Sequence, residues 1–373
     1  MKYVNHIFRI VVLFLIVVFV LCFIFTKTLN HRTTELYLGP KSIWSDCQSL
    51  EIQGKGWTNT ESFYDRLPAK AKKSVPKQVW QLSKNTAGMS IHFTTDASSI
   101  ELKWKLLSEK LAIPKMLANA VSGLDLYSRH KDQNWQFVQN AQPDSLTNTA
   151  SFRLNQAAEY MLYLPLYNGI DSVQIAVPEA KKIASPDKSK TKTRKPVVFY
   201  GTSITQGACA SRPGMAAVAI VGRKLNVPVI NLGFAGNARM ELALAELIAE
   251  LDASVYVIDC LWNMTDKDIH ERFEPFVKKL RQLRPSTPIL LAEDSSYKNH
   301  SPTSKGIIVR SIYQKLKEQA ITNLHFLPNR LMLGTDTEGT IDAVHPNDLG
   351  MMRLADVFVN ALTPILNSQN SAY

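Results

Sequence analysis

The chain has 373 residues, an ordinary apolar fraction of 45% and a formal net charge of +11. Its length exceeds one average domain, so we expect two folded units plus additional segments. The basic excess is concentrated in one segment, and no zinc-finger, RNA-binding or basic-helix pattern accompanies it, which argues against a nucleic-acid partner.

The first predicted element is an apolar helix within residues 1–30. Ile10 to Phe25 is apolar throughout and basic residues precede it. A helix that spans a bilayer needs about 20 residues, so the run is short, but apolar neighbours extend it. Its exit, Phe23 to Lys27, lacks the small residues of a cleavage site, which favours an uncleaved membrane anchor over a signal peptide. Both alternatives predict export, with the body of the protein on the extracytoplasmic side.

Residues 45–180 predict an antiparallel β-sandwich domain. Short apolar alternations with a period of two are separated by Gly, Asn, Asp and Pro, which is typical of strands with one buried face. Lys70 to Lys73 is expected to be a charged loop or a short helical turn. The clearest alternations are Ser90–Thr94, Ile100–Trp104, Asn134–Val138 and Ser172–Val177.

Residues 181–195 predict a basic linker. The segment holds seven Lys and Arg residues against the single acid Asp187, together with Ser, Thr and Pro. This composition is typical of a solvated connection. A contact with an anionic surface or a polysaccharide is the alternative.

Residues 196–368 predict a second domain with a parallel sheet. Apolar runs alternate with helical stretches, a rhythm that places helices on both faces of such a sheet. The expected strands are Val197–Tyr200, Val227–Ile230, Val255–Ile258, Ile289–Leu291 and the weaker Leu324–Leu327. The expected helices are Ala216–Leu225, Met240–Leu251, Asp266–Leu283 and Lys305–Gln319.

Three residues with catalytic potential directly follow predicted strands of this sheet. Ser203 ends the tripeptide Gly201-Thr202-Ser203, and Gly236 and Asn263 come after the next two strands. Ligands of parallel sheets bind at the carboxyl ends of the strands, so we expect these residues to share one site. A serine on a sharp strand-to-helix turn can act as a nucleophile if a base reaches it.

A candidate base lies far downstream, in the segment Asp342 to His345. A serine hydroxyl needs an imidazole to accept its proton, and the imidazole needs an acceptor that holds its tautomer. Asp342 lies three residues before His345, a spacing that lets the acid approach the ring. Pro346 follows, so we expect His345 at a turn or before a helix. Gly236 and Asn263 offer a backbone and an amide donor for an oxyanion. These residues together predict a serine hydrolase.

Five motifs of the chain resemble those of the SGNH hydrolases, the GDSL-like esterases. Gly201 to Gly207 is similar to the first block with Thr202 in place of Asp, and Asn231 to Asn237 is similar to the second. Asp259 to Met264 retains only Asn263 of the third block, whereas Asp342 to Pro346 matches the last. The departures fit a subgroup whose N-terminal sandwich carries a Gly-x-Asp-Leu-Tyr motif, which Gly123-Leu124-Asp125-Leu126-Tyr127 supplies.

The resemblance implies a jelly-roll-like sandwich followed by a flavodoxin-like α/β/α domain. It implies that Ser203 is the nucleophile, His345 the general base and then acid, and Asp342 the residue that orients His345. The N–H groups of Ser203 and Gly236 and the Asn263 amide would form the oxyanion hole. The expected function is hydrolysis of small acyl esters, acetyl first among them, with a carbohydrate as candidate alcohol. Acyl transfer to glycan hydroxyls, or carbohydrate binding without catalysis, are the alternatives.

Four more residues are candidates for substrate binding. Arg239 follows the second block, Trp262 precedes Asn263, and Glu293 and Asp294 end the fourth strand at the same edge of the sheet. Asp125 and Tyr127 are expected to shape a turn or the domain interface. The expected partners are a small-molecule or glycan ester and a membrane, and no cofactor or metal is implied. Cys22, Cys47, Cys209 and Cys260 lack metal-ligand spacing.

Overall fold

The computed structural model describes residues 41–131, 133–187, 194–296 and 302–370. The predicted N-terminal apolar helix and most of the basic linker lie outside these residues. By its contacts the chain divides into Met1–Ile43 with Pro178–Ala180 and a main unit of Trp44–Val177 and Lys181–Tyr373. Ser203 and His345 both lie in the main unit.

The first half of the described chain forms two antiparallel sheets. One has the strand order β1-β9-β4-β7 and the other β10-β3-β8-β5-β6, with β2 paired to β3. Their inner faces enclose a core that includes Trp104, Phe93 and Phe152. These strands are β1 (Ser42–Asp46), β2 (Glu51–Gln53), β3 (Ser90–Thr95), β4 (Ser99–Leu106), β5 (Leu124–Arg129), β6 (Gln136–Ala141), β7 (Thr147–Arg153), β8 (Glu159–Tyr163), β9 (Ile170–Pro178) and β10 (Ile183–Ala184).

The period-two segments of the sandwich are strands, as predicted, with shifts at some ends. β6 begins at Gln136, two residues later than expected. β10 lies inside the predicted linker, where Ile183 and Ala184 pair with Thr95 and Thr94. This part of the basic segment therefore extends the sandwich. Lys70 to Lys73 falls in the 3₁₀ helix η2 (Ala69–Lys73), which precedes α2 (Lys77–Leu82).

The second half forms a five-stranded parallel sheet with the order β12-β11-β13-β14-β15. Numbered along the chain this order is 2-1-3-4-5, that of flavodoxin-like folds, in which ligands bind at the carboxyl ends near the reversal of strand order. The sheet and the sandwich confirm the predicted fold class. Its strands are β11 (Val197–Gly201), β12 (Val229–Gly233), β13 (Val255–Asp259), β14 (Ile289–Ala292) and β15 (Leu324–Leu327).

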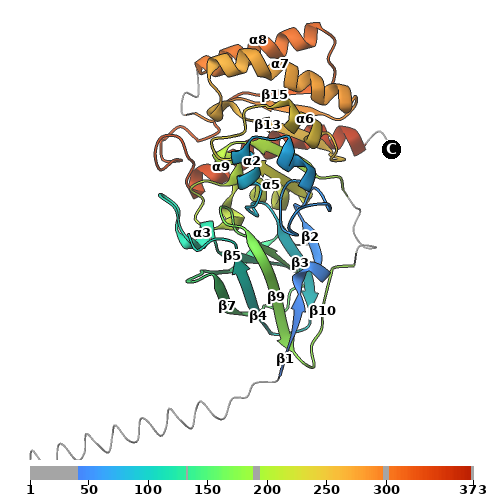
Figure 1. The fold of residues 1–373 in the computed structure, drawn as a ribbon, viewed down its shortest axis with the longest axis vertical. Coiled ribbons are helices and arrows are strands. Elements are labelled where there is room, and N and C mark those ends of the chain that lie inside the picture. The colour runs from blue at the N-terminus through green and yellow to red at the C-terminus, as the bar shows by residue number, and fades with distance from the viewer. Residues whose placement is uncertain (1–40, 132, 188–193, 297–301, 371–373) are drawn as a thin grey trace, which may run out of the picture. The chain divides into compact units, whose positions relative to one another are not determined.

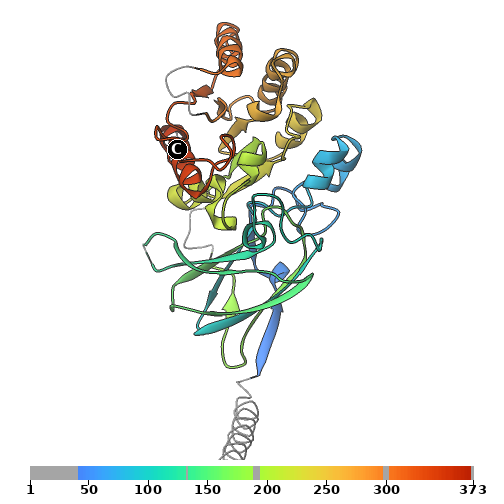
Figure 2. The same cartoon turned by 90° about the vertical axis from the view of Figure 1, so that its left-hand side faces the viewer.

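Helices cover both faces of the parallel sheet (Figures 1 and 2). Alternate residues of β11 enter different cores: Val198 and Tyr200 pack with α6, α7 and α8, whereas Val197 and Phe199 pack with α5 and α9. Both faces are buried, so the strand is continuously apolar. The helices of this half are α4 (Ser203–Gln206), α5 (Ala217–Leu225), α6 (Leu242–Ile248), α7 (Asp266–Leu283), α8 (Ser304–Glu318) and α9 (Asp348–Asn370), with the 3₁₀ helices η4 (Pro213–Met215) and η5 (Leu261–Asn263).

Two predicted elements have different bounds in the structure. β12 begins at Val229, not Val227, because Pro228 has no N–H to donate and serves only as an acceptor, for Val197. α6 begins at Leu242 and not at Met240 because Met240 takes a left-handed φ of 56°, and it ends at Ile248, before the expected Leu251. None of the expected strand segments corresponds to β1, β2, β5, β7 or β8.

α9 is the one helix of the described residues that is long and apolar enough to cross a membrane. Length and composition alone are weak grounds, since the core helix of a globular domain meets the same criteria. Phe358 of α9 packs edge-on against Phe199 of β11, with 5.4 Å between ring centroids. We therefore describe α9 as a core helix.

Candidate active site

Ser203 is the first residue of α4, directly after β11. Thr202 caps this helix: its hydroxyl accepts from the amide of Ile204, and the Thr205 hydroxyl accepts from the amide of Thr202. A Cβ at Gly201 would lie 2.0 Å from the Thr205 hydroxyl, so only glycine permits this close turn. Thr202, which stands where the family motif has Asp, thus performs the capping that holds Ser203 at the carboxyl edge of the sheet.

His345 and Asp342 lie against Ser203, although 142 residues separate His345 from Ser203 along the chain. The Ser203 hydroxyl is 3.0 Å from Nε2 of His345, and Nδ1 of His345 is 2.9 Å from Oδ2 of Asp342. Ser203 and His345 are part-buried, so a substrate can reach them. His345 lies in the loop before α9, as expected from Pro346. The arrangement can transfer a proton from a serine hydroxyl to a ring whose tautomer is held by a carboxylate.

Asp342 is held by its own loop and by the sandwich. Its Oδ1 accepts from the amides of His345 (2.7 Å) and Val344 (3.1 Å), and its Oδ2 also accepts from Lys115 Nζ at 2.6 Å. Partial burial acts to raise the pKa of Asp342, but the hydrogen bonds from Lys115 and His345 outweigh it and hold the pKa well below its ordinary value. Asp342 is therefore ionised at neutral pH.

The two further candidates for the oxyanion hole also follow strands of the parallel sheet. Gly236 has a φ of +70°, and a Cβ built on it would meet nothing within 4 Å. The space beside its backbone is thus open to a ligand. Asn263 ends η5, and its Nδ2 donates to the carbonyl of Phe234 at 3.2 Å, which ties the amide to the loop that carries Gly236. The second amide hydrogen of Asn263 is available to a substrate oxygen.

A buried carboxylate supports the helix that carries Ser203. The Thr205 hydroxyl donates to Oδ2 of Asp259, the last residue of β13, at 2.8 Å. Burial raises the pKa of Asp259 to about 7; the Thr205 hydrogen bond opposes this rise and the charge of Asp294 adds to it. The third motif block therefore supplies Asn263 and also, through Asp259, holds the first block in place.

Two of the four substrate-binding candidates have accessible positions. Trp262 is part-buried, and its indole N–H donates to the carbonyl of Ser295 at 3.0 Å, while Lys305 lies 5.8 Å from the ring centroid. Trp262, which directly precedes Asn263 in the chain, thus links the segments that follow β13 and β14. Arg239 is exposed before α6. Both remain candidates for contact with a substrate.

The other two candidates are buried within the protein. Glu293 is fully buried and forms an ion pair with Arg310 of α8 at 2.5 and 3.0 Å, and it also accepts from the amide of Asn329. Asp294 is 3% exposed and accepts from the Thr303 hydroxyl, the N-cap of α8. These contacts argue against substrate binding and give both acids a structural role, which corrects the sequence-based expectation.

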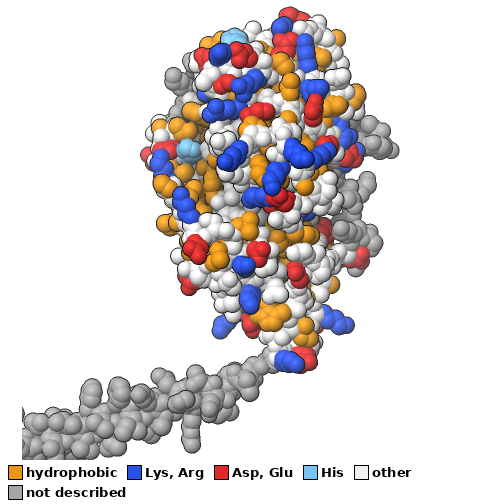
Figure 3. Space-filling view, viewed as in Figure 1, with side chains coloured by type: hydrophobic (Ala, Val, Ile, Leu, Met, Phe, Trp, Pro, Cys, Tyr) orange, Lys and Arg blue, Asp and Glu red, His pale blue; other side chains and the backbone are white. Residues whose placement is uncertain are grey.

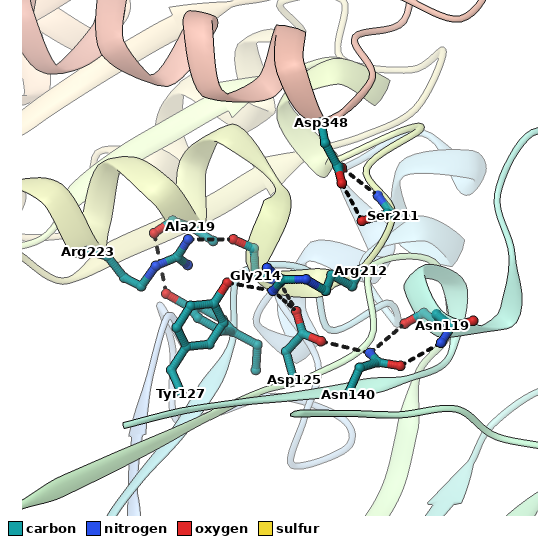
Figure 4. Close-up of polar contacts among 11 residues, drawn as sticks. Asn119, Asp125, Tyr127, Asn140, Ser211, Arg212, Gly214, Ala219, Arg223 and Asp348 are labelled. Atoms are coloured by element: carbon teal, nitrogen blue, oxygen red, sulfur yellow. Dashed lines mark hydrogen bonds and ion pairs between the residues drawn. The ribbon is translucent and has the colours of Figure 1, made fainter. Parts of the chain in front are cut away.

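The Gly-x-Asp-Leu-Tyr motif forms the contact between the sandwich and the segment that follows α4 (Figure 4). Asp125 is fully buried and accepts from Arg212 at 2.9 Å, from the amide of Gly214 at 2.7 Å and from Asn140 at 2.7 Å. The Tyr127 hydroxyl accepts from Arg212 at 2.6 Å. A Cβ at Gly214 would meet the Tyr127 ring at 2.4 Å. The motif shapes the domain interface, as expected, and does not reach Ser203 through any of these contacts.

Two basic residues of the sandwich half support the site and are not among the residues that the motifs predict. Arg66 is fully buried and donates to the carbonyls of Asn231 (3.0 Å) and Gly233 (2.8 Å), the third and last residues of β12. Burial lowers the pKa of Arg66 to about 9. Lys115 contacts Asp342. Both are single basic residues outside any motif, so no local signal distinguishes them from surface residues.

A cavity between the sandwich and the parallel sheet lies away from these residues. Its lining includes His92 and Trp135 on the sandwich side and Val229, the first residue of β12, on the other. Ser203 follows the opposite, carboxyl end of the neighbouring strand. No group of three His, Cys, Asp or Glu among the described residues could hold a metal ion, and Cys47, Cys209 and Cys260 are free thiols.

Comparisons with known families match nearly the whole described chain. The GDSL-like lipase/acylhydrolase family model matches residues 194–363, and a model of the N-terminus of SGNH-hydrolase-type esterases, named for its GxDLY motif, matches residues 42–183. A comparison with curated proteins finds no match.

Solved structures resemble the chain over both domains. A Bacteroides ovatus protein assigned as a GDSL-like lipase is 33% identical, with a TM-score of 0.80, over 88% of this chain and 98% of its own. The salicylyl-acyltransferase SsfX3 from a tetracycline biosynthetic pathway is 17% identical, with a TM-score of 0.68, over 87% and 97%. A family two carbohydrate esterase from Cellvibrio japonicus is 11% identical, with a TM-score of 0.57, over 88% and 99%. The last two likenesses concern the fold alone. Together the family matches and the first structure identify the chain as a member of the GDSL-like, SGNH family of ester hydrolases, in the subgroup with a GxDLY N-terminal domain.

Proposed function

We propose that this protein is a serine esterase that removes small acyl groups, acetyl first among them, from a carbohydrate through an acyl-serine intermediate. One observation carries the esterase mechanism: the hydrogen-bonded series from Ser203 through His345 to Asp342, with separations of 3.0 and 2.9 Å. Ser203 is the nucleophile, His345 the proton carrier and Asp342 the group that orients the ring.

In the first half-reaction the Ser203 oxygen attacks the ester carbonyl carbon while its proton passes to Nε2 of His345. The carbonyl oxygen becomes an oxyanion that accepts hydrogen bonds from the N–H groups of Ser203 and Gly236 and from the Asn263 amide. The C–O bond to the alcohol then breaks, and His345 returns its proton to the departing alkoxide. A water molecule, deprotonated by His345, attacks the acyl-serine and releases the acid and free Ser203.

The choice of acyl group and alcohol rests on the fold likenesses and on the predicted export. The fold likeness to carbohydrate esterases favours a glycan ester, and the salicylyl-acyltransferase likeness favours transfer to another hydroxyl. Trp262 and Arg239 are the proposed substrate contacts. The apolar run Ile10–Phe25 supports export and a membrane anchor, which would bring the enzyme to glycans outside the cytoplasm.

The test compares the protein with its Ser203→Ala variant on acetylated glycans and on nitrophenyl esters of increasing chain length. We expect Ser203-dependent release of acetate, fastest with the shortest acyl chain. An acceptor glycan added to the same reactions separates hydrolysis from transfer, because transfer yields an acylated acceptor in place of free acetate. A fluorophosphonate label on the protein but not on the variant identifies the nucleophile. Equal rates for both proteins would refute the mechanism.

A further inference from the structure

The Asp342 carboxylate accepts hydrogen bonds from two side chains, one three residues away and one from a distant part of the chain. Its Oδ2 oxygen accepts from the ring of His345 at 2.9 Å and from Nζ of Lys115 at 2.6 Å, and 227 residues separate Lys115 from Asp342. The two donors thus share one oxygen atom. A positive charge on the His345 ring would therefore be repelled by the Lys115 ammonium group, which contacts the same oxygen.

The turn that carries Lys115 is built to hold it in place. Ile113 and Met116 exchange backbone hydrogen bonds of 3.1 and 3.0 Å, so Pro114 and Lys115 are the central residues of a tight turn. Lys115 has a φ of +69°, a left-handed conformation that favours Gly or Asn. Met116 is 5% exposed and belongs to the core shared with α5 and α9. The Lys115 side chain is 53% exposed, but its strained turn and the buried Met116 fix where its backbone lies.

The other groups that face Asp342 do not offset this charge. From its own loop come the amides of Val344 and His345, which are neutral donors. The thiol of Cys209 lies beside it after α4; burial and then the charge of Asp342 raise its pKa to about 11, so it is neutral at neutral pH. Lys115 is therefore the fixed positive charge at this carboxylate among the described residues.

We propose that Lys115 is a positioning residue of the catalytic site: it shares Oδ2 of Asp342 with His345 and disfavours the protonated ring. This inference rests on the proposed roles of Ser203, His345 and Asp342. With the ammonium group present, the imidazolium that forms during catalysis is a stronger acid and loses its proton more readily to the departing alkoxide. Loss of the ammonium group should therefore change how activity depends on pH. The sandwich domain thereby adjusts the chemistry of the hydrolase domain.

The test replaces Lys115 with a neutral residue that suits the turn. Lys115→Asn removes the charge and tolerates a positive φ, Lys115→Arg keeps the charge, and Lys110→Asn is a matched control in the same loop, where Lys110 is exposed. We expect the acidic limb of the kcat/KM profile to move up by roughly 0.5 to 1 pH unit in Lys115→Asn. It should stay in place in Lys115→Arg and Lys110→Asn. A merely structural lysine would lower the plateau without moving the limb, and that result would overturn the proposal.

A second measurement is independent of catalysis. The ring of His345 is titrated by NMR in the full protein and in Lys115→Asn, and its signal is identified by loss in His345→Gln. We expect the titration midpoint to rise by a similar amount in Lys115→Asn. Absence of Ser203-dependent ester hydrolysis would refute the proposed function, whereas an unchanged midpoint would refute the role of Lys115 whether or not the protein is active.

Discussion

Asp125 of the sandwich and Arg212 of the hydrolase domain form an ion pair at 2.9 Å, although 87 residues separate them along the chain. The Asp125 side chain is fully buried, whereas Arg212 is 20% exposed. The pair also holds Gly214, whose amide donates to the same carboxylate oxygen at 2.7 Å. The motif that marks the subgroup is thus a joint between domains, located next to the segment that leaves the nucleophile helix.

We expect Asp125→Ala to lower the free energy of unfolding by about 3 kcal/mol, because Arg212, Gly214 and Asn140 lose their acceptor inside the protein. Urea unfolding measures this change. Asp171→Ala is the control, since Asp171 pairs with Lys105 at 3.2 Å and both side chains are 50% exposed. The control should cost less than about 1 kcal/mol. Similar losses in the two variants would contradict the structural role of the motif.

We expect Asn263→Ala to lower kcat by roughly 10²- to 10³-fold with a smaller change in KM, because an oxyanion donor acts mainly in the transition state. Asn263→Asp has the same size but offers a carboxylate in place of the amide, so it should be at least as slow. Steady-state kinetics on a nitrophenyl acetate substrate measure both. An Asn263→Asp variant that retains the original kcat would exclude the amide from the oxyanion hole.

Gly233, the last residue of β12, and Gly236, in the loop that follows, should respond differently to alanine. The added methyl group of Gly236→Ala would contact nothing, but a φ of +70° is strained for alanine. We therefore expect the N–H of residue 236 to shift, with a loss of activity and a stability cost of only about 1 kcal/mol. Gly233→Ala would place a Cβ 2.3 Å from the backbone nitrogen of Gln206, so we expect a larger loss of stability. Thermal unfolding and kcat/KM are measured for both. The reverse pattern would show that Gly236 is structural and not part of the oxyanion hole.

Asp259 should make stability depend on pH. Burial raises its folded pKa to about 7 from 3.8, so the unfolded chain loses this proton at lower pH than the folded chain does. The contribution of Asp259 to the free energy of unfolding is therefore largest below pH 3.8 and declines as the pH rises to about 7. Asp259→Asn is neutral throughout and keeps an acceptor for Thr205. From pH 4 to 7.5 its stability relative to the original protein should rise by on the order of 2 to 4 kcal/mol. A constant difference across this range would contradict the raised pKa.

Much of the fold follows from local patterns. The period-two alternations of Ser90–Thr94 and Ile100–Trp104 and the apolar runs at Val197 and Val255 predict strands that the structure contains. Local steric and capping rules also predict the sharp turn at Ser203, since Gly201 and Thr202 act within a few residues. Two element bounds differ from the prediction. β12 starts after Pro228, whose carbonyl accepts from Val197, and α6 starts after the left-handed Met240, whose amide donates to the Tyr200 hydroxyl.

Strand ends, a turn serine and an Asp-to-His spacing are properties of neighbouring residues, so the residues that could carry the chemistry can be predicted locally. The tertiary structure sets their surroundings. It buries Glu293 against Arg310, seats Arg66 on the end of β12 and brings Lys115 to the oxygen of Asp342 that His345 also uses. The physical reason is that burial and charge act through space: whether a carboxylate faces solvent, an arginine or a catalytic ring depends on which distant segment packs over it.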